Sequence, residues 1–435
     1  MNMVEMIEKK KRGQALADEE IAFFVDGLTQ GTIPDYQISA LAMAIFFRSM
    51  NERETAMLTR CMAKSGDMLD LSCFGNRCAD KHSTGGVGDK TTMIVGPMAA
   101  AMGIKVAKMS GRGLGFTGGT ADKLESIPGF CTNLEQNEMM EIVSQIGLSV
   151  VSQSGKMTPA DKKLYALRDV TGTVDSIPLI ASSIMSKKIA AGAPNIVLDV
   201  KVGNGAFMKD YAEGKKLAEA MVEIGRQCGR RTIAIISDMN QPLGRNVGNT
   251  LEVIEAIDIL KGTAKDGMHA SLRELCIELA AHMAVAALDI SIDTARLQAN
   301  MVLENGSAFS KMQEWIQAQG GDIRCLSDTS LLPISSIKTD ILSSNTGFIS
   351  AVNAENIGHA ALLVGAGRLE LTDKIDHGAG IVLNVKPGDY VKKGDCLCTV
   401  YSNKCADDAF QWAEKAFEFS ETVPFKLPFI YETIA

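Results

Sequence analysis

The sequence predicts an α/β protein in which a small all-helical domain precedes a larger α/β domain and a C-terminal α+β module. Three observations support this prediction. Apolar residues recur at helical spacing through residues 1–65. Short apolar runs, such as 195–201 (NIVLDVK) and 231–237 (RTIAIIS), then alternate with helical patterns and glycine-rich turns, as in a parallel or mixed sheet. Residues 378–402 carry alternating apolar positions punctuated by Pro-Gly and Lys-Gly turns, which indicates a third, β-rich unit.

The individual elements follow from the same patterns. In the N-terminal part, helices are expected over 18–28, 38–47 and 51–63. In the α/β part, we expect a crossover helix at 211–227 and strands at 92–95, 106–109, 195–201 and 231–237. Two further helical segments, 159–170 and 177–191, interrupt the strands, and we expect them to pack back onto the N-terminal helices.

A chain of 435 residues is too long for one hydrophobic core, which stops growing at roughly 250–300 residues. We expect a helical domain of residues 1–68 and 158–193, an α/β domain of 69–157 and 194–334, and a C-terminal module of 335–435. The module's pattern resembles half of a barrel-sandwich hammerhead, as in biotinyl or lipoyl domains. It lacks the exposed lysine hairpin that such carriers need, so we interpret it as a structural unit.

The composition argues against several classes of protein. A formal net charge of −8 does not favour a nucleic-acid or membrane-surface partner. No segment approaches the ~20 apolar residues that span a bilayer, and the N-terminus lacks the apolar core of a secretory signal. The ten cysteines form no CxxC pair and the five histidines form no HxxxH pair, which favours reduced thiols and argues against zinc. We expect a cytoplasmic protein.

The densest chemical signal is residues 80–92, DKHSTGGVGDKTT, where a lysine, a histidine and hydroxyl residues surround three glycines. Glycines let backbone amides close around an anion, and hydroxyls and an ammonium add donors. The segment is not a nucleotide-binding P-loop, because Asp89 separates Gly88 from Lys90. Residues 110–125, SGRGLGFTGGTADKLE, form a second such loop after a strand-like run. Two loops at strand ends would face one crevice, so the sequence predicts an oxyanion site.

These two segments closely resemble the thymidine and pyrimidine-nucleoside phosphorylase family. The resemblance continues through Arg168, the run SSIMSKK (182–188), LDVKVGNGAFMK (198–209) and QPLGRNVGN (241–249), and it covers essentially the whole chain. It implies a homodimer whose helical and α/β domains face each other across a cleft. It also implies phosphorolysis of a pyrimidine nucleoside to free base and pentose 1-phosphate, with phosphate as a co-substrate and no required cofactor.

The resemblance assigns roles to particular residues. Phosphate would be bound by Lys81, Ser83, Thr92, Lys108, Ser110 and Thr120. The pyrimidine would be held by Arg168, Ser183 and Lys187, whose donors suit the ring's carbonyl acceptors. His82, with Arg168 and Lys187, would stabilise the departing base while phosphate attacks C1′ from the opposite face with inversion.

The chain departs from the family at three positions. Phe116 stands where many members have histidine, and Asn246 replaces a small residue. Lys90 stands where bacterial members often carry threonine. In those relatives potassium is held by the residues matching Gly88, Lys90, Leu243, Asn246 and Glu255. A lysine ammonium would compete with potassium for Glu255, so Lys90 either turns away or takes the cation's place. We predict a Lys90–Glu255 ion pair.

Lys108 bears on sugar specificity. Members restricted to 2′-deoxynucleosides carry methionine there, and members that also accept ribonucleosides carry lysine. A lysine donor satisfies a buried ribose 2′-hydroxyl, whereas methionine does not. We therefore expect uridine, thymidine and deoxyuridine to be substrates. A thymidine phosphorylase, an anthranilate phosphoribosyltransferase-like enzyme and a binding protein with incidental catalysis are the alternatives.

Overall fold

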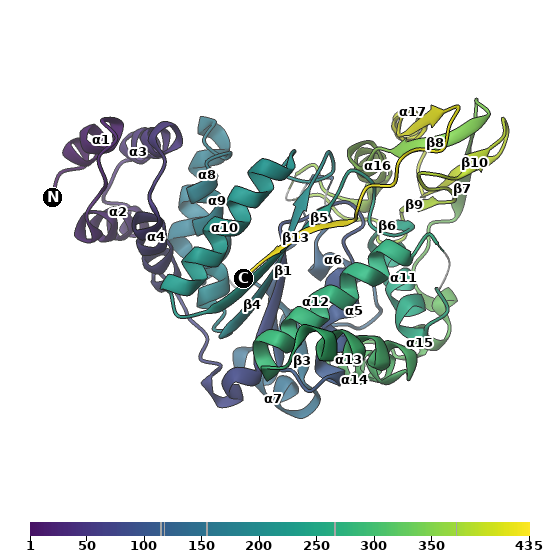
Figure 1. Ribbon diagram of the computed structural model, residues 1–435, viewed down its shortest axis with the longest axis horizontal. Helices are drawn as coiled ribbons and strands as arrows, with labels where there is room; N and C mark the ends of the chain where they lie inside the picture. The colour runs from purple at the N-terminus through teal and green to yellow at the C-terminus, as the bar shows by residue number, and fades with distance from the viewer. Residues whose placement is uncertain (114, 117, 154, 265–266, 371) are drawn as a thin grey trace.

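The computed structural model describes residues 1–113, 115–116, 118–153, 155–264, 267–370 and 372–435. Figure 1 shows three parts in a row: a helical domain at one end, an α/β domain in the middle and a β-rich C-terminal module at the other end. Among the described residues, no helix is long and apolar enough to cross a membrane.

The helical domain is built from two stretches of the chain. The first contains α1 (Met3–Lys11), α2 (Asp18–Gln30), α3 (Asp35–Arg48) and α4 (Glu52–Lys64). The second contains α8 (Pro159–Thr171) and α9 (Ile177–Ala190). As expected from their place in the sequence, α8 packs on α2 and α3, and α9 packs on α4. Their shared core includes Phe24, Ile38, Met62 and Leu164.

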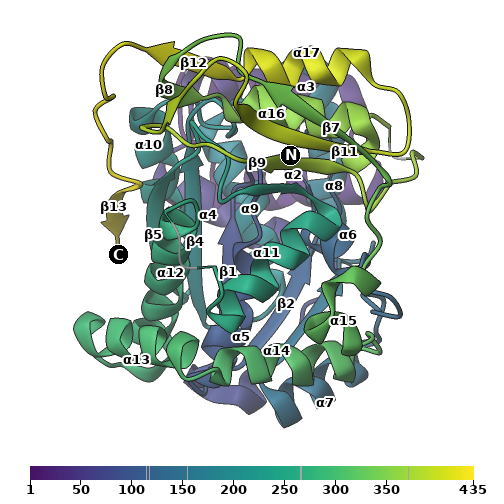
Figure 2. The same cartoon turned by 90° about the vertical axis from the view of Figure 1, so that its right-hand side faces the viewer.

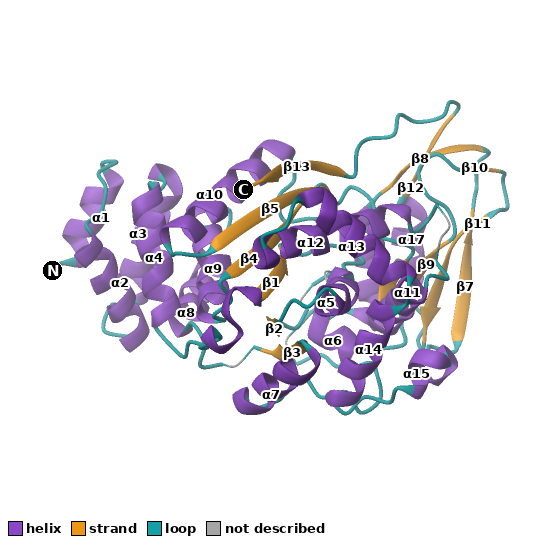
Figure 3. Ribbon diagram, turned by 60° about the horizontal axis from the view of Figure 1, so that its bottom comes forward, coloured by secondary structure: helices purple, strands orange, loops and turns teal. Residues whose placement is uncertain are grey.

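The central sheet of the α/β domain has the order β1-β4-β5-β13. Its strands are β1 (Ala79–Ser83), β4 (Asn195–Val202), β5 (Arg231–Asp238) and β13 (Ile430–Ile434). The first three are parallel, and β13 pairs antiparallel with β5, so the end of the chain completes this sheet (Figure 3). The parallel pair β2 (Val106–Ser110) and β3 (Leu148–Ser152) joins β1 through a parallel bridge between Cys78 and Lys105.

Both faces of the sheet are buried, because alternating apolar residues of β4 belong to two different hydrophobic cores. Val197 belongs to the core shared with α5 (Thr91–Ala101) and α12 (Ala270–Leu288). Ile196 and Leu198 belong to the core shared with α9 and α10 (Tyr211–Gln227). The remaining helical elements of this domain are η1 (Ser72–Arg77), α6 (Thr120–Leu124), α7 (Gln136–Ile146), α11 (Asn249–Lys261), α13 (Ile292–Glu304), α14 (Ser307–Ala318), α15 (Arg324–Ser327) and η2 (Thr329–Leu331).

One sequence prediction in this domain is wrong. Residues 92–95 form part of helix α5 and not a strand. A short apolar run fits a buried helix as well as a buried strand. In α5, every residue except Ala101 is buried. The helix places Thr91 and Thr92 in its first turn, directly after the first glycine loop.

The C-terminal module contains two small sheets, of order β6-β9-β11-β7 and β10-β8-β12. Its elements are β6 (Asn246–Gly248), β7 (Ile337–Leu342), β8 (Gly347–Val352), α16 (Ala354–Ala361), η3 (Leu362–Ala366), β9 (Gly380–Leu383), β10 (Tyr390–Val391), β11 (Cys396–Ser402), α17 (Asp407–Lys415) and β12 (Phe417–Ser420). Because β6 belongs to the α/β part of the chain, the module is joined to that domain by strand pairing. In Figure 2 the module lies across the top of the α/β domain, above α6 and α11.

Candidate active site

Both glycine loops lie at the carboxyl ends of neighbouring strands. Residues 84–90 connect β1 to α5, and residues 111–119 connect β2 to α6. Because β1 and β2 run side by side in the same direction, the two loops meet at one edge of the sheet, where ligands of open α/β sheets bind. Leu114 and Thr117 of the second loop lie outside the described residues.

A cavity of about 190 Å³ lies between these loops and helix α9. Seven of the predicted site residues line it: His82, Ser83, Thr92, Lys108, Ser110, Thr120 and Lys187. It is also lined by Gly85, Asp89, Met109, Gly111, Arg112, Gly118, Gly119, Gln153, Met157 and Lys188. The cavity therefore unites both loops of the α/β domain with two lysines of the helical domain.

Lys81 lies one layer behind the cavity wall. Its ammonium donates to the Thr91 hydroxyl and lies 4.0 Å from Asp89 Oδ1 and 3.8 Å from Asp199 Oδ2. Burial alone would raise the pKa of Asp89, but Lys81 and Lys201 outweigh burial and hold that pKa well below its usual range. Asp89 is thus an ionised group on the cavity wall.

Lys108 and Lys188 are fixed by one buried carboxylate. Asp80 lies 3.4 Å from Lys108 Nζ and accepts from Lys188 Nζ at 2.8 Å. Lys108 also donates to the Lys81 carbonyl. Burial lowers the pKa of Lys108 to about 8, although Asp80 acts to raise it. Since Asp80 is on β1 and Lys188 on α9, this carboxylate also ties the helical domain to the α/β domain.

His82 is a neutral imidazole near pH 7. Burial, together with the positive charges of Lys188 and Lys108, holds its pKa well below the usual range. It lines the cavity next to Ser83. A neutral imidazole in this position offers one N–H donor, and its protonated form is disfavoured by the surrounding ammonium groups.

Lys187 is oriented within the helical domain. Its ammonium lies 2.5 Å from Asp161 Oδ2 and donates to the Ser183 hydroxyl at 3.1 Å. Asp161 is buried at the start of α8. Ser183 does not line the cavity directly, so in this structure it acts on the cavity through Lys187.

Arg168 does not reach the cavity in this structure. Its guanidinium donates to three backbone carbonyls, those of Thr173 at 3.2 Å, Val174 at 2.7 Å and Leu179 at 3.1 Å. These bonds close the turn between α8 and α9. The structure therefore shows Arg168 bracing the helical side of the site, and a contact with the base would need a change in that turn or in the cleft.

The predicted ion pair between Lys90 and Glu255 is present. Lys90 Nζ lies 2.6 Å from Glu255 Oε2 and 2.7 Å from the carbonyl oxygens of Leu243 and Asn246, and its side chain is fully buried. An ammonium has three donors, and all three are used here. These oxygens are among the groups that would hold potassium, and they do not fit a second cation beside the ammonium. The Asn246 side chain turns away and donates to the Leu251 carbonyl.

Phe116, at the position of the family histidine, packs against the C-terminal module. Its ring centroid lies 4.9 Å from that of His359, and His359 in turn lies 4.9 Å from Trp412. The side chain is thus part of an aromatic stack and makes no polar contact across the cleft.

Sequence reasoning missed several residues that shape this site. Asp80 and Lys188 stand inside the quoted motifs, but no signal connected them. Asp161 was missed because its partner Lys187 lies on another helix. Gln153 and Met157 line the cavity from the segment between β3 and α8 and carry no motif.

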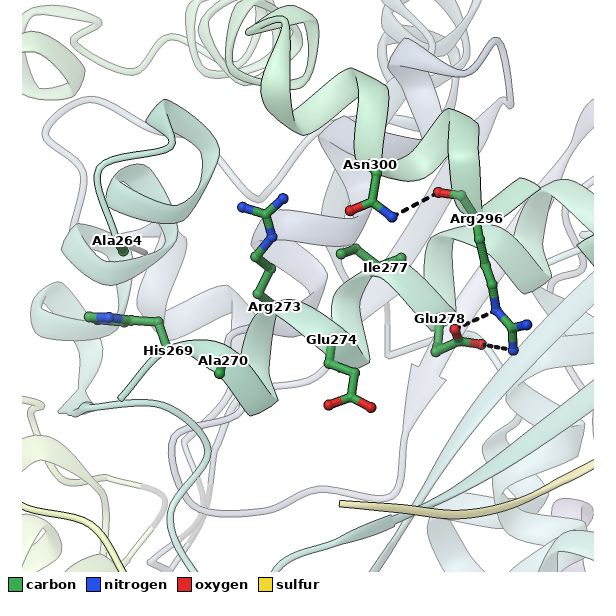
Figure 4. Close-up of a pocket in the computed structure, with 9 residues that line it drawn as sticks. All are labelled: Ala264, His269, Ala270, Arg273, Glu274, Ile277, Glu278, Arg296 and Asn300. Carbon is green, nitrogen blue, oxygen red and sulfur yellow. Dashed lines mark hydrogen bonds and ion pairs between the residues drawn. The ribbon is translucent and has the colours of Figure 1, made fainter. Parts of the chain in front are cut away.

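A larger cavity, of about 470 Å³, lies elsewhere, along α12 and α13 (Figure 4). Its charged side chains are largely matched: Arg296 makes a two-bonded pair with Glu278, at 2.6 and 2.9 Å. It contains none of the glycine-loop residues, and its arrangement does not suggest a reaction.

Comparisons with known proteins agree with this geometry. Residues 4–66 match the helical bundle domain of the glycosyl transferase family, and residues 75–309 match that family's a/b domain. Residues 348–420 match the pyrimidine nucleoside phosphorylase C-terminal domain.

Two relatives that match over most or all of the chain have the same name. The pyrimidine-nucleoside phosphorylase of Geobacillus stearothermophilus is 53% identical over 438 residues, covering 100% of both chains. The protein of the same name from Bacillus subtilis is 53% identical over 93% of both chains. The fold is also similar to that of anthranilate phosphoribosyltransferase from Thermus thermophilus, with a TM-score of 0.58, 20% identity, and coverage of 72% of this chain and 98% of that one.

The fold and the matches define a glycosyl transferase with a helical bundle and an α/β domain. The chain belongs to the pyrimidine-nucleoside phosphorylase family. The match of the C-terminal domain separates it from the anthranilate phosphoribosyltransferase alternative, whose chain aligns with only 72% of this one.

Proposed function

We propose that this protein is a pyrimidine-nucleoside phosphorylase. It catalyses the reversible phosphorolysis of uridine, thymidine and deoxyuridine to the free base and the α-D-(2-deoxy)ribose 1-phosphate. The observation that carries the proposal is one cavity lined by both glycine loops, by His82 and by Lys108 and Lys187. The names of the full-length relatives support the same activity.

Phosphate binds between the two loops. Ser83 and Thr92 line the cavity at the two ends of the first loop, and Ser110 and Thr120 line it at the two ends of the second. Their hydroxyls and the glycine amides donate hydrogen bonds, while Lys81 and Lys108 supply positive charge. A phosphate oxygen attacks C1′ on the face opposite the base. The new C1′–O bond forms as the C1′–N1 bond breaks, so the configuration at C1′ inverts.

The base leaves with the electron pair of the broken bond. The developing negative charge on the pyrimidine carbonyls is stabilised by the Lys187 ammonium and by the N–H of neutral His82. Ser183 acts through Lys187, and Arg168 joins the base site only after a change in the turn between α8 and α9 or in the cleft. Because His82 is neutral, its contribution is a hydrogen bond and not the transfer of a proton from imidazolium. Phosphate carries negative charge next to the cationic sugar of the transition state, which stabilises it further.

The reaction needs no metal cofactor in this account. The Lys90 ammonium serves as a built-in cation among Leu243 O, Asn246 O and Glu255, and it takes the role that potassium would have at this point. Its single positive charge balances the buried Glu255 carboxylate.

The protein acts as a cytoplasmic homodimer. The dimer interface is proposed to lie on the helical domain, where helices α1, α3 and α8 expose apolar side chains that a second copy of the chain would cover. These side chains are Val4, Tyr36, Phe47, Tyr165 and Val170. These helices pack against one another, so their exposed residues lie on one domain. Sedimentation analysis tests this, with twice the mass of the chain expected and a monomer at micromolar concentration contradicting it.

The activity is tested by base release from uridine and thymidine, side by side, with and without phosphate. Release of both uracil and thymine only when phosphate is present is the expected result. Rapid thymine release without any uracil release would identify a thymidine phosphorylase restricted to 2′-deoxynucleosides. No phosphate-dependent release from either nucleoside would contradict the proposal.

A further inference from the structure

The second glycine loop is fastened to the C-terminal module through Arg368. This residue follows η3, and its guanidinium donates to Asp122 Oδ2 at 3.0 Å and to Asp122 Oδ1 at 2.8 Å. Parallel bonds of this kind between an arginine and a carboxylate fix both orientation and distance. Asp122 lies in α6, immediately after the loop, and is almost completely buried.

We propose that Arg368 is a positioning residue for phosphate: through Asp122 it holds the described part of the second loop, residues 111–113, 115–116 and 118–119, in the conformation that binds the anion. The proposal rests on the function proposed above and assigns a catalytic purpose to the C-terminal module. Neither Arg368 nor Asp122 lines the cavity, so both act through the loop.

Asp122 connects Arg368 to the loop backbone. The same carboxylate accepts from the Gly113 amide at 2.7 Å and from Arg112 Nη1 at 3.2 Å. Arg368 adds a bond of its own, from Nη1 to the Gly113 carbonyl at 3.2 Å. Both peptide groups of Gly113 are therefore held by this pair of side chains, in the middle of the loop.

Asp122 has one other guanidinium nearby, and it is a weak replacement for Arg368. Arg112 is the other guanidinium on this carboxylate, but it is 44% exposed and is already bound to Glu125, at 2.5 and 2.8 Å. Without Arg368, the buried Asp122 carboxylate keeps the Gly113 amide and this shared guanidinium as its partners. A buried carboxylate that loses its partner is strongly destabilised, so the loop would rearrange to hydrate it.

Backbone contacts reinforce the same junction. The Gly115 amide donates to the Arg368 carbonyl at 2.9 Å, forming an antiparallel bridge. The two chains approach so closely that a Cβ at Gly367 would lie 2.7 Å from the Gly115 carbonyl oxygen. Phe116 packs beside Gly358 and His359 of α16. Gly113, Gly115 and Phe116 of the loop thus all contact the C-terminal module.

The loop's shape determines the phosphate site. Ser110 and Thr120, both predicted phosphate ligands, flank the loop at its two ends, and Gly111, Gly118 and Gly119 line the cavity between them. A Cβ on Gly119 would overlap the Gly113 amide nitrogen, so the loop folds tightly on itself. A shift at Gly113 is therefore transmitted to the residues that line the cavity.

The test compares Arg368→Ala and Arg368→Lys with a matched control, Arg296→Ala. Arg296 also makes a two-bonded pair with a carboxylate, Glu278, but on α12 and α13, away from the loops (Figure 4). We expect Arg368→Ala to raise the KM for phosphate by about 10- to 100-fold, because small displacements of positioning groups have effects of this size. The KM for the nucleoside should change by less than about threefold. Arg368→Lys should give an intermediate KM for phosphate, because lysine keeps the positive charge but cannot make the two parallel bonds of a guanidinium.

A second readout does not depend on turnover. Phosphate that binds the folded enzyme raises its Tm, and this rise should be present in the wild type and in Arg296→Ala and lost in Arg368→Ala. If Arg368→Ala does not fold, Arg368→Lys decides, because its phosphate KM should still exceed that of the wild type several-fold.

Three results would overturn the proposal. One is a phosphate KM in the Arg368 variants within twofold of the Arg296→Ala value. Another is an equal rise in the KM of both substrates, which would show general structural damage. The third is no phosphate-induced rise in Tm in the wild type. If the wild type binds phosphate but releases no base, the proposed function fails, while the loss of phosphate binding in Arg368→Ala would still support the positioning role.

Discussion

The two glycine loops resemble each other in sequence and differ in what holds them. The first loop is held from inside the α/β domain, where the Lys90 ammonium at its end is surrounded by Leu243 O, Asn246 O and Glu255. The second loop is held from outside, by Arg368 of the C-terminal module acting on Asp122. Similar anion-binding segments can therefore have different supports, and removing Arg368 should affect the second loop more than the first.

Helix α11 connects the two supports. Glu255 pairs with Lys90 of the first loop, and Glu252, three residues earlier on the same helix, lies 2.6 Å from Lys123 Nζ, which follows the second loop. Lys123 also donates to the Asp89 carbonyl of the first loop, at 2.7 Å. The ends of both loops are thus fixed to one helix, and the middle of the second loop depends additionally on the C-terminal module.

The largest effect is expected from removing the internal support. Lys90→Met leaves the buried Glu255 carboxylate without its ammonium partner, although the Arg245 and Asn246 amides still donate to it. This loss should lower the free energy of unfolding by about 3–5 kcal/mol. Lys90→Thr should be similarly unstable in potassium-free buffer and should recover part of this loss in potassium chloride, because the vacated space and the added hydroxyl can accept a cation. Chemical denaturation of each variant in potassium chloride and in tetramethylammonium chloride measures both effects. A wild-type enzyme that is itself stabilised specifically by potassium would contradict the built-in cation.

The next largest effect is on the catalytic efficiency of variants in the loops and in the helical domain. Lys81→Ala, Ser110→Ala and Arg168→Ala should each reduce kcat/KM by about 10²-fold or more. The first two remove donors from the proposed phosphate site, and Arg168→Ala removes the guanidinium that braces the helical side of the site. Steady-state rates with uridine and thymidine measure this. Near-wild-type rates in the loop variants would mean that the two loops do not form the phosphate site.

Much of the fold could be predicted because its signals are local. The runs at 195–201 and 231–237 and the helix at 211–227 carry apolar periodicity within one element, and all three are found in the structure. The segment 92–95 was mistaken for a strand because its apolar run does not distinguish a buried strand from a buried helix.

The site could be predicted only where its residues are contiguous. Lys81, His82 and Ser83 stand together before one glycine loop, and Lys90 could be connected to Glu255 through the family resemblance. Arg368 could not be connected to Asp122, because the two are 246 residues apart and only Asp122 stands in a recognised segment, 110–125. Asp80 and Lys188 both stand in such segments, but they are 108 residues apart and nothing in the sequence pairs them. Buried charge pairs between distant segments leave no periodic signal in a single sequence.

A smaller effect should separate the two sugars. Lys108→Met should reduce kcat/KM for uridine about tenfold more than for thymidine, because a buried 2′-hydroxyl without a partner costs ~1–3 kcal/mol. Burial places the pKa of Lys108 at about 8, so its ammonium is present below pH 8 and is lost as the pH rises above it. The wild-type kcat/KM for phosphate should therefore fall above pH 8, and the Lys108→Met variant should lack this step. An equal loss on both nucleosides would show that Lys108 serves phosphate and not the 2′-hydroxyl.

The smallest effect is a property of His82 alone. Its lowered pKa means that the imidazole is neutral near pH 7 and gains a proton only well below pH 6.5. NMR spectra of the enzyme labelled at histidine should show no titration of His82 between pH 6 and pH 7.5. A midpoint near pH 6.5, the usual value for histidine, would contradict the electrostatic description of the cavity.

The central claim is that both loops bind one phosphate while the helical domain serves the base. Calorimetric titration of phosphate into the wild type, Lys81→Ala, Ser110→Ala and Arg168→Ala tests this claim most directly, because it separates binding from turnover. We expect one phosphate per chain in the wild type, binding at least about tenfold weaker in Lys81→Ala and in Ser110→Ala, and nearly unchanged binding in Arg168→Ala. Wild-type affinity in either loop variant, or a loss in Arg168→Ala as large as in the other two, would contradict it.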